Sequence, residues 1–93
     1  MKNSQTETLV EEVVDIDEVT PCILTVYNDD VNTFQWVIQA LVEVCKHTLE
    51  QAEQCTYMVH YRGKCEVKVG FFKELNPMKQ AISERGIKAT IRK

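Results

Sequence analysis

Hydrophobic residues recur along this 93-residue chain with two periods, and the changes between those periods predict its elements. A β-rich run from Cys22 to Tyr27 predicts a first strand. Helical spacing of apolar residues then predicts a helix over about residues 33–46, with Asn32 or Thr33 as its N-cap. Its wide apolar face consists of Phe34, Val37, Ile38, Leu41, Val42, Val44 and Cys45.

A second helix is predicted to follow almost at once. Thr48 and Gln51 have the spacing of a capping box, and the helix runs from there to about Tyr61. Gly63 is placed to end it in a left-handed conformation. The predicted apolar face consists of Leu49, Ala52, Cys55, Thr56 and Val59. Because the join between the two helices is so short, they must pack as neighbours.

The last third of the chain predicts a strand, a helix and a strand. Residues 64–71 alternate between polar and apolar, as a half-buried strand does, and residues 87–92 alternate again. Pro77 suits the first turn of a helix far better than its interior, so the third helix is predicted to begin near Pro77 and to end before Gly86. The order βααβαβ predicts an α+β two-layer sandwich, a three-stranded antiparallel sheet covered on one face by helices.

Charge divides the chain near residue 20. Residues 1–20 hold six of the fourteen acidic residues but one of the eleven basic residues, and Pro21 separates them from the first strand. We expect residues 1–20 to be a flexible acidic N-terminal tail and residues 21–93 to be one small folded domain. Two questions about the tail stay open: whether Val13 to Val19 pairs with a sheet edge, and whether the tail is more than a solubilising leader.

Composition also narrows the function classes. The chain has no run of eighteen apolar residues and no signal-peptide pattern, so we expect no membrane span and a cytoplasmic location. The four cysteines form no CxxC pair and are expected to stay thiols. The basic excess of residues 21–93 is small and scattered, which argues against nucleic acid as a partner.

Asn28, Asp29 and Asp30 stand together where the first strand turns toward the first helix. Such residues commonly close turns and cap helices, but two adjacent carboxylates exceed what one cap requires. This acceptor-rich corner suits a cationic group or a metal. A metal site from Asp29, Asp30 and His60 is chemically allowed but lacks supporting ligand spacing. A cysteine hydrolase is no better supported, because Cys45 and Cys55 lie on the predicted apolar faces. We therefore expect no metal, no cofactor and no enzymatic activity.

The Asn28–Asp30 segment after a short strand, together with Met-Val-His-Tyr-Arg-Gly-Lys at residues 58–64, resembles the ClpS adaptor family. The resemblance runs from about Cys22 to Arg92. It implies the βααβαβ topology that this family shares with the C-terminal domain of ribosomal protein L7/L12. It also implies an adaptor that binds substrates with a free bulky hydrophobic N-terminal residue (an N-degron) and delivers them to a ClpA- or ClpC-type AAA+ unfoldase. In that family a flexible N-terminal extension assists delivery.

The resemblance assigns roles to particular residues. The contacts to the α-amino group of the substrate match Asn28, Asp30 and His60, and Asp29 completes the acidic corner. An α-ammonium has three donors, so three convergent acceptors satisfy it. The hydrophobic pocket matches Asn32, Phe34, Val37, Thr56 and Val59.

Four positions depart from the usual pattern of the family. Asn32 stands where Thr is common, and Phe34 and Thr56 stand where Met is common. Val31 replaces a Tyr that helps to bind the protease. The preference among Leu, Phe, Tyr and Trp as first residue, and the identity of the partner ATPase, are therefore left open. The alternative function is a non-catalytic docking module of the same fold with a different partner.

Overall fold

The computed structural model describes residues 19–93. The acidic tail of residues 1–20, including the suggested pairing of Val13 to Val19, therefore lies almost entirely outside the described residues. The elements in chain order are β2 (Cys22–Tyr27), α2 (Phe34–Cys45), α3 (Leu49–Arg62), β3 (Lys64–Gly70), α4 (Phe72–Glu84) and β4 (Ala89–Arg92). This order confirms the predicted α+β fold.

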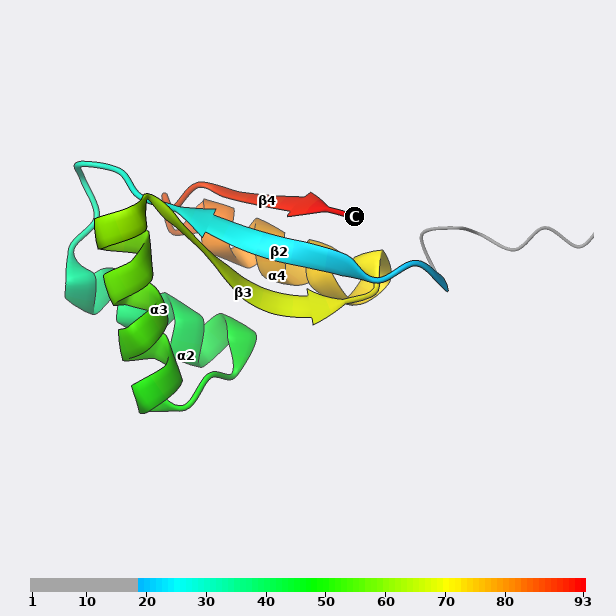
Figure 1. Cartoon of the computed structure of the whole chain (residues 1–93), viewed down its shortest axis with the longest axis horizontal. Helices are drawn as coiled ribbons and strands as arrows, with labels where there is room; N and C mark the ends of the chain where they lie inside the picture. The colour runs from blue at the N-terminus through cyan, green and yellow to red at the C-terminus, as the bar shows by residue number, and fades with distance from the viewer. Residues whose placement is uncertain (1–18) are drawn as a thin grey trace, which may run out of the picture.

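β2 is the central strand of the sheet and pairs antiparallel with β3 on one side and β4 on the other. Figure 1 shows α4 lying along one face of the sheet, while α2 and α3 pack together at the end where β2 finishes and β3 begins. The core forms between these layers, where the side chains of Leu24, Val26, Leu41, Leu75 and Ile82 are almost completely buried.

The ends of α2 and α3 confirm the predicted caps. The Thr33 hydroxyl accepts a hydrogen bond from the Trp36 N–H, and both bonds of the capping box at the start of α3 are present. Gly63 ends α3 with φ of 90°, a conformation that favours glycine. Leu49 was wrongly assigned to the apolar face, since its side chain is 62% exposed. It lies at the first position of α3, in a turn that extends away from the sheet (Figure 1).

A β-bulge in β3 explains a second difference from the predicted pattern. The register with β2 shifts between Leu24 and Thr25, which leaves Val67 as an extra residue on β3. The bulge reverses which side chains face the core, so Val69 is 63% exposed although strict alternation predicted that it points inward. The carbonyl of Val67 accepts a hydrogen bond from Nε2 of His47 at 2.8 Å.

α4 begins at Phe72, and the prediction that it begins near Pro77 was wrong. The carbonyl of Phe71 accepts the N–H groups of Glu74 and Leu75 at 2.9 and 3.0 Å, which closes the first turn ahead of the proline. Leu75 is completely buried, so packing against the core fixes this turn. Pro77 consequently lies inside the helix, where one intrahelical hydrogen bond is missing.

Pro77→Ala is expected to stabilise the domain by about 1–3 kcal/mol, because it restores an N–H donor and removes a ring that crowds the preceding turn. Urea unfolding followed by circular dichroism measures the change. Gln80→Ala, at an exposed position of the same helix, is the matched control and should change stability by less than about 0.5 kcal/mol. A Pro77→Ala protein no more stable than wild type would mean that α4 accommodates the proline without cost.

Candidate functional site

Backbone hydrogen bonds join the end of β2 to the residue that follows α3 and to the segment that precedes β4. The N–H of Asn28 donates to the carbonyl of Gly63 at 2.9 Å, and the N–H of Tyr27 donates to the carbonyl of Lys88 at 3.0 Å. The first of these bonds places Asn28 beside the final turn of α3, which carries His60. The acceptor-rich corner and the histidine, separated by about thirty residues in sequence, therefore lie side by side.

A hollow opens at this junction, between the loop after β2, the start of α2 and the second half of α3. Its lining consists of Asn28, Asn32, Thr33, Phe34, Val37, Thr56, Val59 and His60. The structure thus brings together seven of the nine residues that the family resemblance singled out, and it adds Thr33. The sequence analysis considered Thr33 only as an N-cap, although its position directly before Phe34 could have suggested more.

Asp29 does not line the hollow, and its hydrogen bonds stabilise the loop. Its carboxylate accepts hydrogen bonds from the backbone N–H groups of Val31 and Asn32, both at 2.8 Å, and from Nδ2 of Asn32 at 2.6 Å. The backbone N–H of Asn32, followed by that of Val31, lowers the pKa of Asp29 below its ordinary value. Asp29 is therefore a charged residue that holds the shape of the loop.

Asp30 is exposed and is not part of the lining. Its carboxylate has no hydrogen-bond partner among residues 19–93. It lies two residues from Asn28 on the same loop, where it can approach a cation held at the rim. Its place in an amine-binding site remains a proposal.

The loop and the start of α2 are tied to the C-terminal end of α4. Nδ2 of Asn32 donates to the carbonyl of Gly86 at 3.0 Å, and Nε1 of Trp36 donates to the carbonyl of Arg85 at 2.8 Å. The Arg85 guanidinium also pairs with Glu43 at 2.8 Å and lowers the pKa of that carboxyl. These contacts hold one wall of the hollow. Sequence reasoning missed them because they join residues about fifty positions apart.

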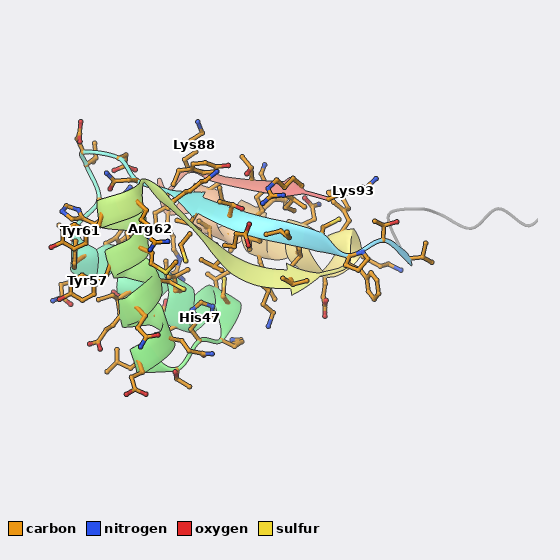
Figure 2. All side chains as sticks on the ribbon, viewed as in Figure 1. His47, Tyr57, Tyr61, Arg62, Lys88 and Lys93 are labelled. Atoms are coloured by element: carbon orange, nitrogen blue, oxygen red, sulfur yellow. The ribbon has the colours of Figure 1, made fainter. Side chains whose placement is uncertain are left out.

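Four aromatic rings form a closed cluster at the rim. Phe34 meets His60 and Tyr57 edge-on, with ring centroids 4.9 and 5.3 Å apart. Tyr61 meets His60 edge-on at 4.9 Å and lies parallel to Tyr57 at 6.0 Å. Figure 2 shows both tyrosines on the side of α3 that faces away from the sheet. The cluster fixes the orientation of the His60 ring, and both ring nitrogens lack a hydrogen-bond partner among residues 19–93.

The hollow is small, and Phe34 is its largest apolar lining residue. The free volume is about 20 Å³, which is room for about one water molecule. A bulky side chain can enter only if lining side chains such as the Phe34 ring move aside. Phe34 makes two edge-on aromatic contacts, worth about 0.5–1.5 kcal/mol each, so a guest has to replace contacts of about the size that its own burial contributes.

Other chemistries find less support in residues 19–93. Within that range no cluster of three or more His, Cys, Asp or Glu side chains is arranged to hold a metal ion. None of the helices described there is long and apolar enough to cross a membrane. Burial raises the pKa of Cys45 to about 11 and that of Cys65 to about 12. These two thiols are therefore protonated at neutral pH and are poor nucleophiles.

Comparison with known proteins gives one family. The family described as ATP-dependent Clp protease adaptor protein ClpS matches residues 17–90, which is most of the chain. A search of curated proteins returned no significant match. The matched range contains every residue that lines the hollow.

Proposed function

This chain belongs to the ClpS family of Clp protease adaptors, and from that premise we propose that it binds proteins through a bulky hydrophobic first residue with a free α-amine. It then delivers them to a ClpA- or ClpC-type AAA+ unfoldase for degradation. The proposal places this delivery in the cytoplasm. The observation that carries it is that two exposed polar residues, Asn28 and His60, line the hollow beside the less exposed apolar residues Phe34, Val37 and Val59.

The polar lining residues suit an α-ammonium group. That cation presents three N–H donors, and the Asn28 amide oxygen and a His60 ring nitrogen are two acceptors within one small space. The exposed carboxylate of Asp30 supplies the third acceptor and a compensating charge. Hydrogen bonds to a charged group contribute about 1.5–3 kcal/mol each when shielded from water.

The apolar lining residues suit the side chain that follows the amine. Burying one large apolar side chain contributes about 1.5–3 kcal/mol. Ordering and association oppose binding by at least several kcal/mol, so the net affinity is expected to be about micromolar or somewhat tighter. An adaptor with this affinity can hold its cargo and still release it.

The decisive test is a set of fluorescent peptides that differ only in their first residue, titrated with the protein and followed by anisotropy. Peptides that begin with Leu, Phe, Tyr or Trp are expected to bind, whereas those that begin with Ala, Ser or Glu are not. Equal affinity for every first residue would contradict the proposal and favour the docking module with a different partner.

Phe34→Ala is expected to extend binding to peptides that begin with Ile or Val, with a gain of about tenfold or more in affinity. The Phe34 ring lines the hollow and contacts the His60 ring, so removing it is expected to make room for a branch at the β-carbon. The same anisotropy assay measures the change, and Leu49→Ala, at an exposed position far from the hollow, is the control. If the preference of the variant is unchanged, Phe34 is only a packing residue.

A further inference from the structure

We propose that the hollow selects Tyr or Trp over Phe or Leu as the first residue, because two of its lining residues, Asn32 and Thr56, offer hydrogen-bond acceptors but no free donors. This inference rests on the proposed function and concerns the substrate preference of the same site. Two of the residues that depart from the family pattern carry it, Asn32 and Thr56.

Asn32 lines the hollow and keeps an unused acceptor. A side-chain amide has two N–H donors and one carbonyl oxygen. Both donors of Asn32 are used, one on the Asp29 carboxylate at 2.6 Å and one on the carbonyl of Gly86 at 3.0 Å. Within residues 19–93 its Oδ1 has no hydrogen-bond partner. Asn32 can therefore only accept a further hydrogen bond.

Thr56, which is more buried than Asn32, also keeps an unused acceptor and has no free donor. Its side chain is 2% exposed, and its hydroxyl donates to the carbonyl of Ala52 at 2.7 Å. With its single hydrogen used in this way, the hydroxyl oxygen keeps only its lone pairs. A methionine at this position would present no such acceptor of comparable strength, because a thioether sulfur accepts only weakly.

The depth of Thr56 fits the length of an aromatic first residue. Thr56 and His60 are four residues apart in α3, so they lie on one face with a separation of ~6 Å along the axis. A substrate whose amine is held beside His60 directs its side chain along this face. The far end of a tyrosine or tryptophan side chain then reaches the level of Thr56.

Tyrosine and tryptophan carry a donor at that end, and phenylalanine and leucine do not. A buried phenol O–H or indole N–H needs an acceptor, and Asn32 and Thr56 each keep one. Thr33 also lines the hollow, and its hydroxyl accepts from the Trp36 N–H while keeping its own O–H as a donor, but the residue is exposed and this donor can be satisfied by water. A net hydrogen bond of this kind corresponds to about three- to tenfold in affinity.

The test uses first residues that differ only in the donor. Trp is compared with 3-benzothienylalanine, which has the same shape but no N–H, and Tyr is compared with 4-fluorophenylalanine. All peptides have a free amine and are otherwise identical. The wild-type protein is expected to bind the donor-bearing member of each pair about three- to tenfold more tightly.

Two variants assign the effect to Thr56. Thr56→Val keeps the shape of the side chain and removes the oxygen, and it is expected to reduce both ratios toward one. Thr56→Ser keeps the hydroxyl and is expected to preserve them. Thermal unfolding of each variant checks that it folds, and the wild-type ratios test the proposal even if Thr56→Val does not.

Equal affinity within both pairs for the wild-type protein would overturn this inference. Ratios that persist unchanged in folded Thr56→Val would also overturn it as an assignment to Thr56. Neither result would contradict the proposed function. That proposal is contradicted by a different result, equal binding of acetylated and free peptides.

Discussion

Acetylation of the α-amine is expected to weaken the binding of a Phe-initiated peptide by at least about a hundredfold, equivalent to about 2.7 kcal/mol. The acetyl group removes the positive charge and all but one of the donors. The acceptors of Asn28 and His60 then lose their partners but stay shielded by the peptide. Two lost hydrogen bonds to a charged group account for this magnitude, at about 1.5–3 kcal/mol each. Anisotropy titration of the acetylated and free peptides at pH 7 measures it.

A double-mutant cycle tests whether the cost of acetylation depends on the side chain of Asn28. Asn28→Ala removes the side-chain acceptor but leaves the backbone bond to Gly63 in place. Acetylation should therefore cost less in Asn28→Ala than in the wild type. Val31→Ala, at an 85% exposed position of the same loop, is the matched control and should show the full cost. Equal binding of acetylated and free peptides would remove the α-amine from the recognition and favour the docking module.

Affinity is expected to follow a bell-shaped pH profile whose acid limb belongs to His60. His60 is the only lining residue with an imidazole side chain, and only its neutral form offers a ring nitrogen as an acceptor. A protonated imidazole offers no acceptor and repels the ammonium of the peptide, so affinity falls as the pH drops. On the alkaline side the free α-amine, with an ordinary pKa of about 7.7–8.0, loses its proton and affinity falls again.

His60→Gln tests the assignment, because glutamine offers an acceptor but does not titrate. The acid limb should be absent from this variant, while the alkaline limb is retained. Asp29 is not expected to produce the acid limb, since the N–H groups of Asn32 and Val31 hold its pKa below the ordinary value. An acid limb that survives in His60→Gln would show that the ring of His60 is not the acceptor.

The parts of the fold that local sequence decides were predictable. The capping box of Thr48 and Gln51 and the left-handed conformation of Gly63 each depend on residues within one turn. The structure has both features as expected. The bulge that turns Val69 outward depends instead on pairing between strands, and the early start of α4 depends on the burial of Leu75. Neither is visible in a pattern read along one segment.

The same distinction applies to the hollow. Helical spacing placed Phe34, Val37 and Val59 on apolar faces, and the family resemblance then put them around one site. The use of Asn32 to tie the loop to Gly86 could not be predicted, because the two residues are fifty-four positions apart. That contact also decides which polar atoms the hollow leaves for a ligand.

We expect the first residue of a substrate to enter the hollow between Asn28 and Thr56. An amide NMR titration of the isotope-labelled protein with a Phe-initiated peptide shows where it binds. We expect chemical-shift changes to concentrate at Asn28, Val37, Val59 and His60, and to vanish with the acetylated peptide. A second hollow, of about 330 Å³ and lined by Met58, Arg62, Lys64, Cys65 and Glu66, provides the contrast. Changes concentrated there, or identical changes with both peptides, would contradict the account.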